Sequence, residues 1–147
     1  MSRTLDVNIL LYASNETCAE HGAAMAALEA LATGPGLVYL FWPTVMAYLR
    51  LATHPAVAVR PLSIDEALAN IDELLARPNI RTAGEGEAFW RRLREVVEDA
   101  RPTGNLVPDA HLAALMLEHG VGTIVTRDRD FRRYRHVAIE DPFSPQS

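Results

Sequence analysis

The chain has 147 residues, of which 49% are hydrophobic and 22% are charged, and its formal net charge is −5. This composition excludes a disordered chain and predicts one soluble domain over residues 1–147, with about 142–147 as a polar tail. The single cysteine excludes an internal disulfide framework and a cysteine-built zinc site. The richest apolar stretch, residues 38–49, is shorter than the roughly 20 residues of a membrane span, so a cytoplasmic protein without a membrane partner is expected.

Strand-like and helix-like patterns alternate along the chain. In chain order, the predicted elements are a strand at 3–5, a helix at 16–33, a strand at 37–41, a helix at 43–53, a helix opened by Ser63, a short strand at 79–81, a helix at 84–101, a helix at 109–118, a strand at 121–126, a charged loop at 127–135 and a strand at 136–140. This alternation favours an α/β fold with a parallel sheet.

Several residues mark where the predicted helices begin and end. Ser63 and Glu66 have the spacing of a capping box, in which each side chain satisfies a backbone N–H of the other residue. Pro43 suits the first turn of its helix, and Gly120 is a natural helix terminator. Phe131 is expected to be the one buried anchor of the charged loop.

Four aspartates lie where the predicted strands end or the helices begin: Asp6, Asp109, Asp128 and Asp130. Each has an ordinary explanation, because aspartate caps helices, suits a first helical turn and forms turns. Taken together they predict more, since ligands gather at the carboxyl ends of parallel strands. Carboxylates that meet there repel one another unless a hard divalent cation such as Mg²⁺ or Mn²⁺ lies between them.

All the basic residues are arginines, and five of the 14 fall in one loop: Arg127, Arg129, Arg132, Arg133 and Arg135. A guanidinium group matches phosphate oxygens in pairs, so the loop is a candidate for contacts with a nucleic-acid backbone. The alternative is a solvated loop whose arginines pair with Glu140 and Asp141. The sequence leaves both interpretations open.

Three segments in order, residues 6–13, 107–114 and 126–131, resemble the sequence signatures of the PIN-domain ribonucleases, and most of all the VapC-type toxins of bacterial toxin–antitoxin pairs. The resemblance implies a three-layer α/β/α sandwich with a central parallel sheet. It also implies a Mg²⁺- or Mn²⁺-dependent endoribonuclease toxin, a homodimer and a cognate VapB-type antitoxin. The RNA substrate, whether tRNA, rRNA or mRNA, is not specified by the sequence.

Carried over by position, the resemblance makes Asp6, Asp109 and Asp128 the catalytic metal ligands. Supporting or substrate-contacting roles fall to the neighbouring polar residues Asn8, Arg50, Asp130, Arg127 and Arg129. The expected mechanism is in-line attack of an activated water on the phosphodiester, which leaves a 5′-phosphate and a 3′-hydroxyl.

One position departs from the family pattern. Many members carry a glutamate three residues before the arginine at position 50, whereas this chain has Ala47. The alternative function is therefore a degenerate PIN domain that binds RNA or antitoxin without cleaving. A phosphoryl-transfer domain of receiver or phosphatase type is a weaker alternative, because the chain has no lysine for the phosphate.

Overall fold

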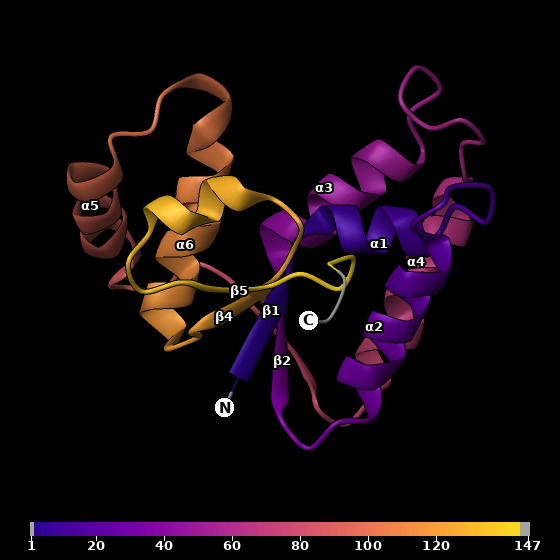
Figure 1. Ribbon diagram of the computed structural model, residues 1–147, viewed down its shortest axis with the longest axis horizontal. Coiled ribbons are helices and arrows are strands. Elements are labelled where there is room, and N and C mark those ends of the chain that lie inside the picture. The colour runs from indigo at the N-terminus through magenta and orange to yellow at the C-terminus, as the bar shows by residue number, and fades with distance from the viewer. Residues whose placement is uncertain (1, 145–147) are drawn as a thin grey trace.

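The computed structural model describes residues 2–144, and its centre is a five-stranded, fully parallel sheet (Figure 1). The strands are β1 (Ser2–Leu5), β2 (Leu37–Phe41), β3 (Ile80–Ala83), β4 (Thr123–Val125) and β5 (Ala138–Glu140). Their order across the sheet is β3-β2-β1-β4-β5. The first strand of the chain is therefore the central strand.

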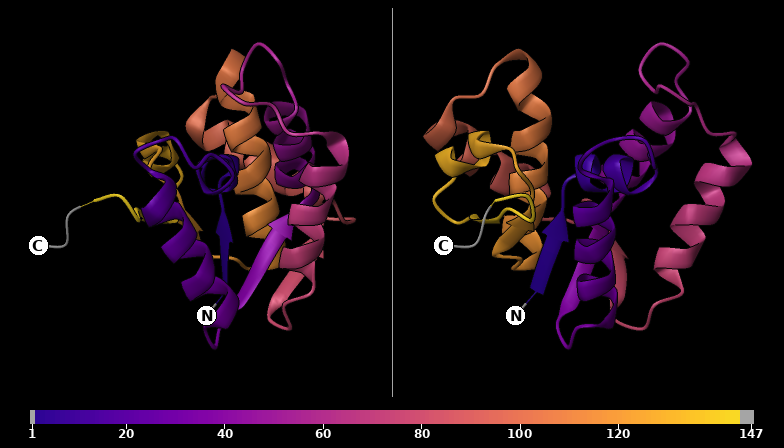
Figure 2. Two further views of the ribbon diagram at one scale, coloured as in Figure 1. Left: turned by 90° about the vertical axis from the view of Figure 1, so that its right-hand side faces the viewer. Right: turned by 45° about the vertical axis from the view of Figure 1, so that its right-hand side comes forward.

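Helices cover both faces of the sheet and confirm the predicted three-layer α/β/α sandwich (Figures 1 and 2). They are α1 (Val7–Ala13), α2 (His21–Thr33), α3 (Trp42–Ala52), α4 (Ile64–Leu75), α5 (Phe89–Ala100) and α6 (Val107–His119), with the 3₁₀ turns η1 (Gly104–Leu106) and η2 (Arg129–Arg133). The helices α1 to α4 pack on one face, and α5 and α6 pack on the other. Within residues 2–144, no helix is long and apolar enough to cross a membrane.

Strand β2 shows how the sequence produces two cores. Successive side chains of a strand point to opposite faces of the sheet. Val38 and Leu40 accordingly join the core under α1 to α4, while Phe41 joins the core under α5 and α6. All three are buried, as expected for a continuous apolar strand covered on both sides.

The predicted capping box is present at the start of α4. The Ser63 hydroxyl accepts a hydrogen bond from the backbone N–H of Glu66 at 3.1 Å, and the Glu66 carboxylate accepts one from the Ser63 N–H at 3.1 Å. These two hydrogen bonds to Ser63 lower the pKa of Glu66. The buried anchor Phe131 is also confirmed, since it is 1% exposed.

Two predicted helices begin later than expected. The helix predicted over 16–33 starts at His21, because the Asn15 side chain accepts hydrogen bonds from the Thr17 N–H and hydroxyl and forms a turn. The helix predicted over 84–101 starts at Phe89, because the Glu118 carboxylate draws the preceding backbone into a loop through two N–H groups. The short helix α1 was not predicted as an element of its own.

The C-terminal segment is only partly a free tail. Phe143 packs edge-on against Tyr12 of α1, with ring centroids 5.4 Å apart. An aromatic pair of this geometry adds to the burial of both rings. Residues 145–147 of the predicted tail lie outside the described residues.

Candidate functional site

Three of the four predicted aspartates converge at the carboxyl edge of the sheet. Strands β1 and β4 are parallel neighbours, so the segments that follow them lie side by side. Asp128 and Asp130 follow β4, and Asp109 lies in the first turn of α6. One carboxylate oxygen from each of these three residues lies within 4.8 Å of the others. We call these three residues the acid cluster.

Asp6 stands next to the acid cluster and is fixed by Thr126. Its backbone N–H donates to the carbonyl of Val125 at 3.0 Å, which continues the pairing of β1 with β4. The buried hydroxyl of Thr126 donates to Oδ2 of Asp6 at 2.9 Å and accepts the N–H of Asp128 at 3.0 Å. One hydroxyl therefore connects two of the predicted metal ligands. Thr126 was not predicted, although its spacing from Asp128 is that of a serine or threonine turn.

The electrostatics of the site favour a cation. Burial and the neighbouring carboxylates Asp128, Asp6 and Asp130 raise the pKa of Asp109 to about 6. Burial is also the largest reason that the pKa of Asp6 is raised; the Thr126 hydrogen bond opposes this shift, and the charge of Asp128 adds to it. Crowded, partly desolvated carboxylates of this kind fit a hard divalent ion, because oxygen donors are what Mg²⁺ and Mn²⁺ prefer.

A buried tyrosine adds a polar group beside these acids. Tyr134 is 3% exposed, and its hydroxyl has no hydrogen-bond partner among the described residues. Burial is the largest cause that raises the pKa of Tyr134, and the negative charge of Asp109 raises it further. Nothing in the sequence distinguishes this tyrosine from an ordinary core aromatic.

Asp130 has a larger part than the sequence suggested. It was expected as an acid near the ligands, and it lies within the acid cluster. Its backbone N–H donates to Oδ1 of Asp128 at 2.9 Å, so the turn-forming explanation of Asp128 also holds. The local turn thus brings the two carboxylates together.

The remaining predicted polar residues lie on α1 and α3. Asn8 is half-buried in the first turn of α1, two residues after Asp6. Arg50 is exposed in the last turn of α3, and Ala47 lies one turn earlier. Among residues 2–144, the side chains of Asn8 and Arg50 form neither a hydrogen bond nor an ion pair.

Arg127 points away from the acid cluster. Its guanidinium carbon lies 5.0 Å from the ring centroid of Phe143 and 5.9 Å from that of Tyr12, and it pairs with Glu20 at 3.3 Å. The alternative pairing of the arginine loop with Glu140 and Asp141 does not occur among the described residues. Instead, Glu140 pairs with Arg3 at 3.0 Å.

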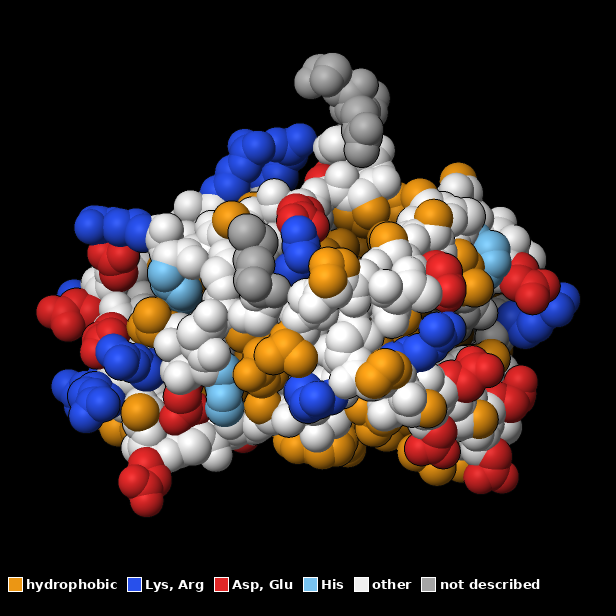
Figure 3. Space-filling model, turned by 90° about the horizontal axis from the view of Figure 1, so that it is seen from below, with side chains coloured by type: hydrophobic (Ala, Val, Ile, Leu, Met, Phe, Trp, Pro, Cys, Tyr) orange, Lys and Arg blue, Asp and Glu red, His pale blue; other side chains and the backbone are white. Residues whose placement is uncertain are grey.

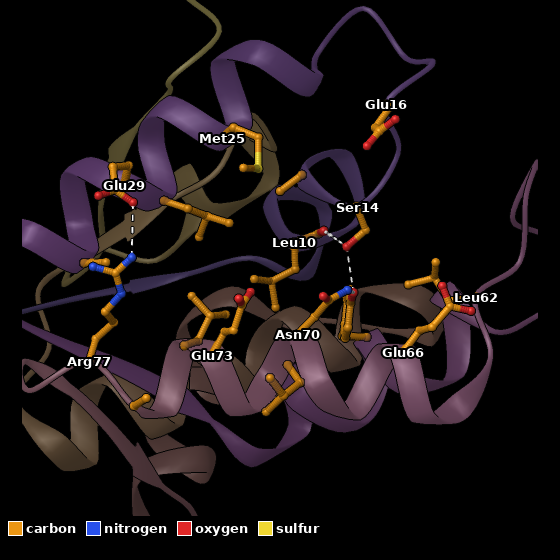
Figure 4. A pocket seen from close by; sticks show the side chains of 17 residues that line it. Leu10, Ser14, Glu16, Met25, Glu29, Leu62, Glu66, Asn70, Glu73 and Arg77 are labelled. Atoms are coloured by element: carbon orange, nitrogen blue, oxygen red, sulfur yellow. Dashed lines mark hydrogen bonds and ion pairs between the residues drawn. The ribbon is translucent and has the colours of Figure 1, made fainter.

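A groove lies beside α1 and shares no lining residue with the acid cluster. This groove of about 570 Å³ is lined by α1, α2 and α4, with an apolar floor that includes Leu10 and Ile71 (Figure 4). Acidic side chains surround it: Glu16, Glu29, Glu66 and Glu73. The single basic residue of its lining, Arg77, already pairs with Glu29 at 3.3 Å. We call this feature the acidic groove.

Comparisons with known proteins agree with this geometry. The model of the PIN domain family matches residues 4–137. Ribonuclease VapC48 of Mycobacterium tuberculosis is 46% identical over 144 residues, which is 98% of this chain and 99% of the relative.

Solved structures share the fold at lower sequence identity. VapBC2 from Rickettsia felis, bound to a promoter DNA fragment, has a TM-score of 0.68 and 18% identity, and the match covers 95% of this chain and 98% of that one. A toxin–antitoxin complex from Klebsiella pneumoniae has a TM-score of 0.62 and 19% identity, with coverage of 97% and 99%.

Proposed function

Because this chain belongs to the PIN domain family, among its VapC-type ribonucleases, we propose that it is a metal-dependent endoribonuclease toxin that acts in the cytoplasm. The observation that carries the proposal is the acid cluster, in which three carboxylates lie within 4.8 Å. The relative named as a ribonuclease supports the choice of RNA as substrate, since it matches nearly the whole chain.

Asp109, Asp128 and Asp130 would hold the metal ion, with Asp6 beside them. A bound Mg²⁺ or Mn²⁺ supplies Lewis-acid stabilisation of the charge that develops on the phosphoryl oxygen. The Thr126 hydroxyl holds Oδ2 of Asp6 and the backbone N–H of Asp128, so it fixes the carboxylate of Asp6 and the backbone from which the Asp128 side chain starts. Such fixed partners behind the ligands maintain metal affinity.

The test is incubation of antitoxin-free protein with total bacterial RNA and Mg²⁺ or Mn²⁺. We expect discrete fragments that disappear with EDTA and in Asp6→Asn and Asp109→Asn variants. Each replacement keeps the shape of the side chain, so circular dichroism should show a folded protein. Unchanged cleavage in either folded variant would contradict the site assignment.

Ala47 favours a second candidate, an RNA- or antitoxin-binding module that does not cleave. With alanine at this position, the site has one carboxylate fewer than the usual family pattern. RNA that is bound but left intact in the same assay would support this alternative. Restored cleavage by Ala47→Glu would then identify the missing acid as the cause.

The acidic groove is the surface that we assign to a VapB-type antitoxin. Its apolar floor and acidic rim match a basic amphipathic helix, which buries one face and presents arginine or lysine to the rim. The floor is held in shape by the Tyr48 hydroxyl, which accepts from the Asn70 amide at 2.9 Å and lies 2.6 Å from the Ser14 hydroxyl. We expect the groove to exist before the partner binds.

Charge reversal tests this assignment. Glu16→Lys with Glu73→Lys should weaken binding of the cognate VapB-type antitoxin, measured by calorimetry. Glu87→Lys with Glu98→Lys makes the same charge change away from the groove and serves as the control. Equal affinities in both double variants would exclude the groove as the antitoxin surface.

A homodimer is supported by exposed aromatic and apolar side chains. Trp42 and Met46 lie one turn apart on α3 and are 45% and 61% exposed. Trp42 also lies against Gly84, on the segment that leads to α5. We expect Met46→Asp to halve the molecular mass measured by light scattering, because it places a charge in the proposed interface. Val59→Asp, in an exposed loop, is the control and should leave the mass unchanged. A parent chain that is already monomeric would contradict the proposal.

A further inference from the structure

The 3₁₀ turn η2 separates the arginine loop into three faces. Side chains three residues apart are eclipsed in a 3₁₀ helix. Phe131 of η2 and Tyr134, the residue that directly follows η2, both enter the core. Asp130 and Arg133 share the face toward the acids, where the positive charge of Arg133 opposes the upward shift in the pKa of Asp109. The third face belongs to Arg129 and Arg132.

This third face borders a groove that the acid cluster does not share. The groove has a volume of about 520 Å³, and four arginines line it: Arg127, Arg129, Arg132 and Arg135. The one carboxylate in its lining, Asp141, accepts hydrogen bonds from the Phe143 N–H and the Ser144 hydroxyl. Figure 3 shows basic side chains gathered at the upper left edge of the molecule, over η2 and the segment after it. We call this feature the arginine groove.

Two of the four arginines have their charge balanced within the protein, and two do not. Arg127 pairs with Glu20 at 3.3 Å and Arg135 pairs with Asp99 at 3.4 Å. Arg129 and Arg132 are exposed and form no ion pair within residues 2–144. Both side chains start three residues apart on η2 and line the same groove, so their guanidinium groups can reach one anion together.

An RNA strand is the anion that the location favours. The acid cluster repels phosphate groups, so a strand that reaches it needs cations close by. Asp130 and Arg129 are adjacent residues of the same turn, and therefore a strand that crosses η2 leaves the acid cluster and enters the arginine groove. The formal net charge of −5 means that the protein as a whole does not attract RNA, which is also negative. Binding of RNA therefore needs a local group of basic side chains such as this groove.

We propose that the arginine groove binds the phosphate backbone of the RNA substrate outside the cleaved bond, through Arg129 and Arg132. Arg127 fixes one end of the groove, because it is held against Tyr12 and Phe143. The proposal rests on the proposed function. It assigns different roles to Arg127 and Arg129, for which the sequence predicted one shared role.

The experiment measures RNA binding in an Asp109→Asn background, so cleavage does not interfere. A single-stranded RNA of about 30 nucleotides and one of about 4 nucleotides are titrated by fluorescence anisotropy at several salt concentrations. The test variant is Arg129→Ala/Arg132→Ala. Its control is Arg60→Ala/Arg94→Ala, which removes the same charge from exposed arginines that have no ion pair among the described residues.

We expect the test variant to bind the long RNA roughly tenfold more weakly than the control does, with little change for the short one. The slope of log Kd against log salt should fall by about 1.4, the value for two lost single-strand phosphate contacts. Circular dichroism melting should be unchanged, because both arginines are exposed.

Other results would overturn the proposal. Equal loss in the test and control variants would mean that only net charge matters, and no loss in either would leave the groove without a part in RNA binding. If the test variant bound the antitoxin more weakly but bound RNA as before, the arginine groove would be a binding site for a protein partner and not for RNA. Cleavage of total RNA by the chain with Asp109 intact reports separately on the proposed function, so the two ideas can fail independently.

Discussion

Thr126 has more influence on the acids than its size suggests, because its single hydroxyl both donates to Asp6 and accepts from Asp128. Thr126→Val keeps the shape of the side chain and removes both hydrogen bonds. We expect Mn²⁺ affinity, measured by calorimetry, to fall about 10- to 100-fold. Thr126→Ser keeps the hydroxyl and should bind nearly as the parent does; equal losses in both variants would indicate a packing effect instead.

Asp109 makes the metal-free protein sensitive to pH. Its pKa is about 6 in the folded state, compared with 3.8 as its ordinary value. The folded state therefore favours the neutral acid, and this stabilisation is complete below about pH 4 and lost as the pH rises through 6. Asp109→Asn stays neutral throughout, so it should be more stable than the parent above pH 6.

The measurement is thermal unfolding in EDTA from pH 4 to pH 8. Because the carboxyl is only half-buried and solvent screens its charge, we expect the gain in the free energy of unfolding to be about 1 kcal/mol. This gain corresponds to about 2–4 °C in Tm. The gain should shrink between pH 6 and pH 4. Asp72→Asn, at an exposed acid on α4, is the control; an equal gain there would remove Asp109 as the cause.

Among the elements, α4 offers the clearest test of a sequence signal. Ser63→Ala deletes one half of the capping box and should lower the free energy of unfolding by about 1 kcal/mol. Urea titration measures this loss. Ser63→Asp retains a cap acceptor and should recover most of it, whereas full stability in the alanine variant would mean that α4 is held by packing alone.

The elements that could be predicted are those whose signals are local. Strand β2 is a continuous apolar run, and its predicted bounds, 37–41, are those observed. The late start of α5 could not be predicted, because it depends on Glu118, which lies 30 residues beyond Ala88. The late start of α2 comes from the turn at Asn15 and Thr17, a local signal that the prediction of this helix did not use. Helix α1 is a nearly continuous apolar run of seven residues, and such a short run shows no helical periodicity, so it was not predicted as a helix.

The same distinction applies to the candidate site. That aspartates would gather at the sheet edge followed from their positions at the ends of predicted parallel strands and the starts of helices. Which oxygen atoms meet depends on the turn at Asp128, and this turn placed Asp130 in the acid cluster while Thr126 held Asp6 beside it. The outward direction of Arg127 depends on Phe143 and Glu20, which are distant in sequence.

For the whole molecule, metal binding should be visible as stability. An ion that binds only the folded state stabilises it by about 2.7 kcal/mol at 100 times its Kd. We expect saturating Mn²⁺ at pH 7.5 to raise Tm by about 5–10 °C and EDTA to reverse the rise. The rise should be much smaller in Asp128→Asn, and an equal rise in that variant would place the ion elsewhere.

The order of the strands also has a consequence for synthesis. Asp6 and the Thr126 hydroxyl that fixes it are 120 residues apart in the chain, and Thr126 directly follows β4. At about 5–20 residues per second, roughly 6 to 24 seconds separate the two on the ribosome. Until then β1 has an open edge and the carboxylates have no common site. A chain released before Asp130 lacks part of the acid cluster, so the metal centre can form only after Asp130 has been made.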